Sequence, residues 1–201
     1  MLADTIFSFP ASTFPPLALG FFGLGTGYLI YGPQELFKLP PRDPRVDLGT
    51  GVWGIWMPGF LQFLTGTYLF VGLAWFHSFT QPALYMAALA FTAYGVHWFA
   101  MGYNRAHGAD ARPNGFMSPA FILISLLGSI VFFKAGDAAV GGLFIGLALV
   151  YISDLPASLG LGPEGLAERA LGFFHLGTGL WLMYLVYGVT LNFAAGFSVP
   201  V

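Results

Sequence analysis

The sequence predicts an all-α integral membrane protein, a bundle of six transmembrane helices that forms one domain over residues 1–201. Two observations predict this fold class. First, 57% of the residues are hydrophobic and only 8% are charged, whereas soluble proteins carry roughly 25% charged residues. Second, the apolar residues lie in charge-free stretches long enough for membrane crossings of about 20 residues each. An ordinary soluble enzyme is therefore excluded.

The helices are expected where Asp, Glu, Lys and Arg are absent and between Gly and Pro breaks. The six ranges are 16–37, 50–76, 83–103, 116–134, 138–156 and 168–193. The first lies largely in the charge-free stretch 5–34. The second and third share the longest such stretch, 48–104, and are divided by the break at 77–82.

The last three helices follow from shorter charge-free stretches, which cover 113–133, 138–153 and 170–201. The break at 135–137 separates the fourth helix from the fifth, and the break at 159–165 separates the fifth from the sixth. Six spans need about 120 residues, which leaves no room for a second, soluble domain. The first helix follows a start without basic residues, so we expect it to remain in the mature protein.

Charge and cysteine content exclude further classes. The formal net charge is −2, without the basic stripe that a nucleic-acid partner needs. The chain has no cysteine, so disulfides and thiolate metal sites are excluded. There is also no Gly-x-Ser-x-Gly motif. We therefore expect no catalytic residues, no metal site and no cofactor.

Glycine makes up 28 of the 201 residues, about twice the usual share of roughly 7%. Gly23 and Gly27 form one Gly-x-x-x-Gly pair, and Gly142 and Gly146 form another. Such pairs let helix backbones approach closely in a membrane. We interpret them as packing faces within the bundle, some of which contact neighbouring subunits in a homo-oligomer.

The predicted spans contain few polar side chains and no charged residue near their middles, which argues against a carboxylate proton relay. Their polar residues are Thr26, Gln62, Thr65, Thr67, Tyr94, His97, Ser125, Ser129, His175, Thr178, Tyr184 and Asn192. Most of them are expected to hydrogen-bond between helices.

Three roles are open for His97 and His175. They are either neutral packing residues, pore-lining or pH-sensing residues, or ligands of a haem held between helices. His77 and His107 lie at expected helix ends, where they would be solvated.

Three stretches resemble the acetate uptake transporter family, which includes the SatP-type acetate and succinate channels. Gln62–Gly66 resembles the family's Gln-x-x-x-Gly, and Tyr94–Trp98 resembles its Tyr-Gly-x-x-Trp. The range 179–192 resembles the family's last helix. The family's N-terminal signature is only partly present, at 13–19 followed by Phe22.

The resemblance implies a channel or transporter for acetate and other short monocarboxylates, with succinate as a further substrate. It also implies hexamers with one pore per protomer, narrowed by Phe22, Tyr94 and Leu147. Relatives carry acidic residues where this chain has Leu69 and Val189. These two replacements bear on ionic coupling and substrate choice more than on the fold.

A pore of this kind excludes ions by dewetting at its apolar ring. The middles of the spans contain no Lys or Arg, so neutral donors must hold the substrate, and Thr26, Gln62 and Asn192 are the candidates. Weak binding of this kind suits a channel, and the protonated acid should pass more easily than its anion. Thr13 is expected to cap the first helix and place a partial positive charge near the pore mouth.

Two other functions stay open at this point. A channel for neutral solutes such as urea or short amides fits an uncharged interior equally well. A haem- or quinone-binding membrane anchor would use His97 and His175.

We expect a multi-pass protein of the cell membrane, with its orientation open. The positive-inside rule places both termini outside, because six of the seven basic residues lie in loops on the other side. These are Lys38, Arg42, Arg45, Arg105, Arg112 and Arg169. The family resemblance instead suggests an N-terminus inside the cell.

Overall fold

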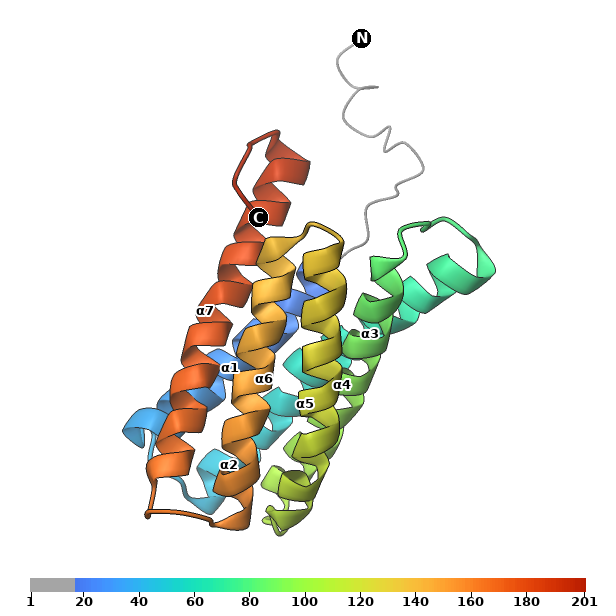
Figure 1. Cartoon of the computed structure of the whole chain (residues 1–201). Helices are drawn as coiled ribbons and strands as arrows, with labels where there is room; N and C mark the ends of the chain where they lie inside the picture. The colour runs from blue at the N-terminus through green and yellow to red at the C-terminus, as the bar shows by residue number, and fades with distance from the viewer. Residues whose placement is uncertain (1–16) are drawn as a thin grey trace.

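Six long helices run side by side through the molecule (Figure 1). The computed structural model describes residues 17–201, and over that range it contains no strand. The elements are α1 (Leu17–Phe37), α2 (Pro44–Gly54), η1 (Ile55–Phe60), α3 (Leu61–Phe70), η2 (Val71–Trp75), α4 (Ala83–Ala106), α5 (Arg112–Lys134), α6 (Ala138–Leu159) and α7 (Leu166–Ala195). The predicted six-helix fold is confirmed, because α2, η1, α3 and η2 form one continuous helix.

The second helix begins six residues earlier than expected, at Pro44. Asp43 caps it, and its Oδ1 accepts hydrogen bonds from the backbone N–H of Arg45 at 2.7 Å and of Val46 at 3.0 Å. Proline suits the first turn because it needs no hydrogen-bond donor there. The charge-free criterion therefore missed a first turn that carries Arg45 and Asp47.

Two π-helical turns, η1 and η2, interrupt the second helix. Pro58 lies inside η1, where its missing N–H and its ring disturb the regular α-helical ladder. This segment packs against α1, whose predicted Gly-x-x-x-Gly pair allows the close approach. A Cβ on Gly23 would lie 2.5 Å from the Met57 carbonyl oxygen, and one on Gly27 would lie 2.7 Å from Pro58 Cγ. The packing role expected for this pair is thus confirmed.

The second predicted pair behaves differently. A Cβ on Gly146 would lie 2.7 Å from Thr178 Oγ1 of α7, whereas one on Gly142 would meet no atom within 4 Å. Only Gly146 therefore serves helix packing within the protomer.

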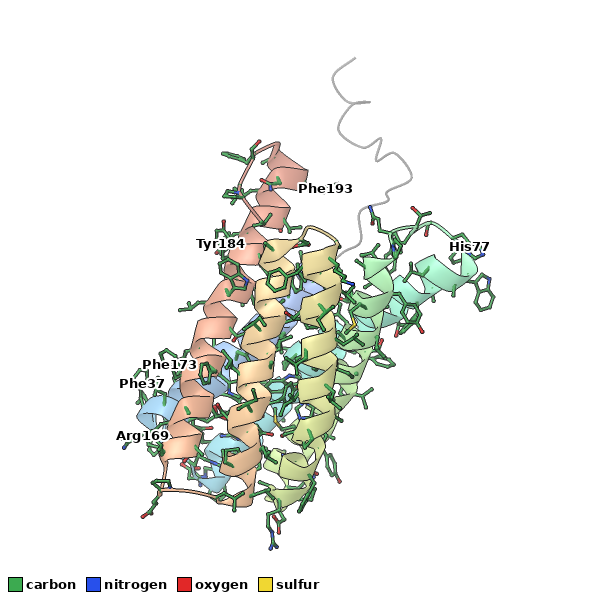
Figure 2. The ribbon with its side chains drawn as sticks, in the orientation of Figure 1. Phe37, His77, Arg169, Phe173, Tyr184 and Phe193 are labelled. Carbon is green, nitrogen blue, oxygen red and sulfur yellow. The ribbon has the colours of Figure 1, made fainter. Side chains whose placement is uncertain are left out.

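Five of the six helices are long and apolar enough to cross a membrane, namely all except α1. Helix α1 packs along α7 and against the second helix, and more than half of its residues are buried. Large apolar side chains such as Phe173 and Tyr187 cover the outer surface, and Figure 2 shows Phe173 and Tyr184 along the outside of α7. The chain is a multi-pass membrane protein.

The helix ends divide the loops between two ends of the bundle (Figure 1). The start of α1, the loop between α5 and α6, and the C-terminus lie at one end. The other end holds the C-terminal end of α1, the start of α2, the loop from α4 to α5 and the loop from α6 to α7. His77 lies in the exposed loop after η2 (Figure 2), and His107 follows α4, as expected for helix-end residues.

Candidate functional site

A polar cavity of about 290 Å³ lies between α1, α4, α6 and α7, near the C-terminal end of α1. Its wall includes Glu35, His97, Arg105, Asp154 and His175, together with several tyrosines. It reaches the surface, since Arg42 and Glu168 at its rim are partly exposed. The structure thus brings the two predicted histidines into one cavity, although they are far apart in the sequence.

His175 forms a buried pair with Glu35. The imidazole Nδ1 lies 2.6 Å from Glu35 Oε2, and neither residue is more than 8% exposed. The Tyr28 ring packs on the imidazole, with 4.5 Å between the ring centroids. Glu35 lies near the end of α1, and the sequence analysis assigned it no role. Its partner lies 140 residues further along the chain, so no local pattern could reveal the pair.

Arg105 brings a positive charge to the same cavity. Its Nε donates to Asp47 Oδ1 at 3.2 Å, and its guanidinium lies 4.2 Å from the centroid of the Tyr31 ring. Its Nη2 is buried and has no hydrogen-bond partner among residues 17–201. At the rim, Arg42 donates to the same Asp47 carboxylate, and these hydrogen bonds raise the pKa of the Arg42 guanidinium.

Two further polar groups face this cavity from α6 and α4. Asp154 accepts hydrogen bonds from Ser118 Oγ at 2.6 Å and from Ser158 Oγ at 2.8 Å. His97 Nδ1 lies 3.2 Å from the Tyr151 hydroxyl, while the buried His97 Nε2 has no partner within the described range. The wall of this cavity therefore carries a guanidinium, two imidazoles and carboxylates, whereas the sequence indicated an uncharged interior.

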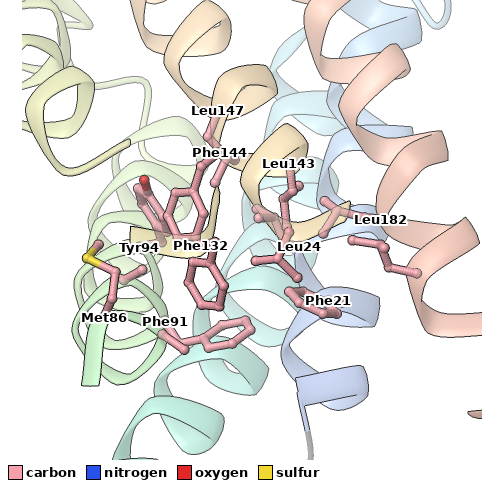
Figure 3. Packing of buried hydrophobic residues seen from close by; sticks show 14 of the residues in the cluster. Phe21, Leu24, Met86, Phe91, Tyr94, Phe132, Leu143, Phe144, Leu147 and Leu182 are labelled. Carbon is pink, nitrogen blue, oxygen red and sulfur yellow. The ribbon is translucent and has the colours of Figure 1, made fainter. Parts of the chain in front are cut away.

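A second, apolar cavity lies nearer the other end of the bundle and has a volume of about 20 Å³. That is room for about one water molecule. Tyr94 and Leu147 both line it, as do Phe21, Phe91 and Phe144. Figure 3 shows these side chains gathered between α1, α4 and α6. The structure thus brings together two of the three residues expected at a constriction.

The third expected residue, Phe22, does not line this cavity. Its side chain is 44% exposed on the outside of α1, whereas Phe21 is only 4% exposed and faces the cavity. Successive residues on a helix point about 100° apart. The expectation for Phe22 is therefore wrong by one position, and Phe21 stands beside Tyr94 and Leu147.

Gln62 also lines the apolar cavity, as the only polar residue there besides Tyr94 among the described residues. Its side chain is completely buried, and neither its amide nitrogen nor its amide oxygen has a hydrogen-bond partner in the range 17–201. Leaving buried polar groups unpaired costs about 1–3 kcal/mol. Such groups are rare in folded proteins and require an explanation.

The other two expected binding residues lie elsewhere. Thr26 is partly buried on α1 and lines neither cavity. Asn192 holds the C-terminal segment: its Nδ2 donates to the Val199 carbonyl at 2.8 Å, and its Oδ1 accepts from the Val199 N–H at 2.6 Å. Neither position supports direct contact with a solute in these cavities. The expected helix cap at Thr13 lies outside the described residues.

An aromatic layer separates the two cavities. The Tyr94 ring stacks on the Tyr151 ring with centroids 5.8 Å apart. Phe121 packs on both, at 5.4 Å and 5.0 Å. Because Tyr94 lines the apolar cavity and Tyr151 lines the polar one, this layer is the barrier between them.

Several polar residues expected to bond between helices bond within their own helix instead. Thr65, Thr67 and Ser125 each donate to the carbonyl oxygen four residues earlier. Only Ser125 also reaches another helix, since its Oγ lies 2.9 Å from the Tyr94 hydroxyl. This contact fixes the Tyr94 side chain within the barrier.

Each of the two predicted histidines is held by a polar contact through its imidazole. Each has its Nδ1 within hydrogen-bond distance of a protein group, Tyr151 for His97 and Glu35 for His175. Within residues 17–201, no group of three or more His, Asp or Glu side chains could hold a metal ion.

Comparison with known proteins shows the fold. No family model matches the sequence, and no curated protein matches it either. Among solved structures, the structure of the bacterial acetate channel SatP matches with a TM-score of 0.75 and 18% sequence identity. The match covers 94% of this chain and 98% of the other. The two proteins therefore share one six-helix fold over nearly their whole lengths.

Proposed function

We propose that this membrane protein is a channel or transporter for acetate and other short monocarboxylates, and that the solute passes between the two cavities inside each protomer. The observation that carries the proposal is Gln62, which lines the apolar cavity and whose fully buried amide has no hydrogen-bond partner within residues 17–201. The fold shared with an acetate channel supports it.

The Gln62 amide suits a small neutral acid. A carboxylic acid has one O–H donor and a carbonyl acceptor, so it can pair with both Oε1 and Nε2. A carboxylate has acceptors alone and would leave Oε1 unpaired. Its charge would also meet the high cost of desolvation in an apolar cavity. The protonated acid is therefore the form that crosses this half of the pathway.

The polar cavity acts as the vestibule. A carboxylate entering it is attracted by the Arg105 guanidinium, whose Nη2 has no partner among residues 17–201, while the other end of the pathway is apolar. Charge-assisted hydrogen bonds of this kind are about twice as strong as neutral ones. The solute is thus collected as an anion and crosses as an acid.

The Glu35–His175 pair at this vestibule is the candidate for pH sensing. An imidazole changes its charge near neutral pH, and this one touches a buried carboxylate at the cavity wall. The contact is an ion pair when the imidazole carries a charge and a hydrogen bond when it does not. Glu35→Gln with His175 intact should therefore alter how flux depends on pH, measured in the assay below.

The apolar cavity is closed to anything larger than about one water molecule in this conformation. Passage therefore requires Phe21, Tyr94 and Leu147 to move apart. An apolar constriction of this type stops ions by dewetting.

The test is uptake of labelled solutes into liposomes that contain the purified protein, with protein-free liposomes subtracted. The panel contains acetate, succinate, acetamide and urea, at several pH values. Saturable acetate uptake that falls as pH rises is the expected result. Uptake equal to that of protein-free liposomes for every acid would overturn the proposal.

A channel for neutral amides is the second candidate, because the free Nε2 and Oε1 of Gln62 also match an amide group. Competition separates the two functions. If urea or acetamide is transported and acetate does not compete, the solute is an amide. A Soret band in the purified protein would instead favour the haem-binding anchor.

Two further expectations belong to this proposal. We propose a homo-oligomer, because a Cβ on Gly142 or Gly177 would meet no atom of the described protomer within 4 Å, and such small residues let helices of neighbouring subunits approach closely. Native mass spectrometry measures the number of subunits. We also propose that the vestibule faces the cell interior, since Arg42, Arg105 and other basic residues gather at that end. Reporter fusions at both termini test this orientation.

A further inference from the structure

We propose that Ser125 determines which protonation state of the solute crosses the barrier, because it fixes the direction of the hydrogen bond that Tyr94 makes. This inference rests on the proposed function. It makes Ser125 a positioning residue that acts through Tyr94 and has no contact with the solute itself.

The direction of the bond follows from counting protons. Ser125 Oγ lies 2.6 Å from the carbonyl oxygen of Phe121 and 2.9 Å from the hydroxyl oxygen of Tyr94. A carbonyl has no proton to give, so the single Ser125 proton goes to Phe121. The other bond therefore uses the Tyr94 proton, which is donated to Ser125.

Ser125 and Tyr94 are both shielded from bulk water, so water cannot replace the hydrogen bonds that they make. Ser125 is fully buried and Tyr94 is 2% exposed. The rings of Phe121 and Tyr151 pack on Tyr94 and hold its orientation. The phenol proton is therefore committed to Ser125, and only oxygen lone pairs remain for any further partner.

An acceptor at this point discriminates between the acid and its anion. The O–H of a carboxylic acid donates to the Tyr94 oxygen, whereas a carboxylate meets it with a second set of lone pairs. In a site of low dielectric this repulsion is strong. A tyrosine with its proton free would do the opposite, since it would donate to the anion.

Ser125→Ala tests the inference by returning the Tyr94 proton to the pathway. Ser125→Thr is the matched control, because threonine keeps the hydroxyl and makes the same bond to the carbonyl four residues earlier. Ser125→Cys repeats the test if the alanine variant does not fold, since a thiol is only a weak acceptor and donor.

The measurement is labelled acetate uptake under an imposed membrane potential, with the protein in liposomes and protein-free liposomes subtracted. Passage of a neutral acid moves no charge, whereas a potential of about 100 mV strongly drives an anion. For wild type and Ser125→Thr we expect uptake that changes less than about twofold with potential. For Ser125→Ala we expect a component at neutral pH that changes more than about fivefold.

Each other outcome overturns a defined part of the reasoning. Wild-type acetate uptake that depends on the potential refutes the inference and passage in the acid form, while the function as an acetate channel or transporter stands. Potential-independent uptake in both Ser125→Ala and Ser125→Cys refutes it as well. Wild-type protein without acetate uptake above that of protein-free liposomes refutes the proposed function, and the inference with it.

Discussion

Replacing Gln62 with leucine should make the protein more stable and less active at the same time. The two side chains are similar in size, so the change fills the same space next to Tyr94 and Leu147. It removes an amide nitrogen and an amide oxygen that are buried without partners in the described part of the chain. A substitution that only damaged packing would lower both stability and flux.

The size of the gain follows from this burial. A buried polar group without a hydrogen bond costs about 1–3 kcal/mol in proteins, and Gln62 is 0% exposed. Leucine carries no such penalty, and it gains contacts with the apolar wall. We therefore expect Gln62→Leu to raise the free energy of unfolding by about 1–3 kcal/mol. Acetate flux should fall to near that of protein-free liposomes, because the solute loses its only amide partner on this wall.

Gln34→Leu is the matched control. Gln34 is also 0% exposed, but it lines neither cavity, and its Nε2 donates to the Pro40 carbonyl at 3.3 Å. Its replacement removes one buried atom without a partner in the described range, Oε1, but also loses this hydrogen bond. It should therefore stabilise less than Gln62→Leu and leave the flux unchanged. Unfolding of the purified variants in detergent gives the stabilities, and the liposome assay gives the flux.

Two results would refute this reasoning. If Gln62→Leu lowers stability by more than about 1 kcal/mol, the amide has a structural partner that offsets its burial. If the variant transports acetate as the wild type does, Gln62 does not contact the solute. A loss of flux in both Gln62→Leu and Gln34→Leu would show that the effect is indirect.

Three further outcomes follow from the structure. Gly95→Ala should cost about 1–3 kcal/mol of stability, because its Cβ would lie 2.6 Å from the Phe63 backbone nitrogen. Gly142→Ala should instead raise the stability by up to about 1 kcal/mol, because its Cβ would meet no described atom within 4 Å. Thermal unfolding of the two variants compares these effects. Phe21→Ala should raise flux or widen the range of solutes, whereas Phe22→Ala should change neither; equal effects in the uptake assay would contradict the placement of α1. Hydrogen bonds from Arg112 lower the pKa of Asp110 to about 2. A lowered pKa stabilises the fold at pH values above the unfolded pKa near 3.9, and this stabilisation is lost as pH falls through the folded pKa. The difference in unfolding midpoint between wild type and Asp110→Asn should therefore shrink between about pH 4 and about pH 2 and stay constant at higher pH.

The pathway shows where sequence reasoning reaches its limit. Residues 17–25 of α1 are all apolar, so this part of the sequence contains no polar side chain that tells which residues point inward. When the inward-facing side of a helix is not known, an assignment that is one position too late selects a side chain on the outside in place of one at the cavity. This is the case for Phe22, which is exposed, and Phe21, which is buried. Tyr94, which was assigned from the Tyr-Gly-x-x-Trp pattern, lines the apolar cavity.

The vestibule was missed for a different reason. Glu35 and Asp154 lie close to helix ends, where charged residues are usually solvated. Their burial depends on the start of α7 and the start of α5, which supply His175 and Ser118. A charge count along one helix contains no information about these neighbours.

The sequence by itself determined the membrane environment, the six helices and the small-residue packing, because each follows from hydropathy and residue size along one segment. Only the tertiary structure decided which groups stay without partners, since this depends on side chains brought together from distant segments. Gln62 is polar in the sequence, but it is an unpaired amide only because α1, α4 and α6 surround it with apolar side chains. In the same way, the hydrogen bond of Tyr94 and its direction depend on Ser125, which the packing of α5 against α4 brings next to Tyr94.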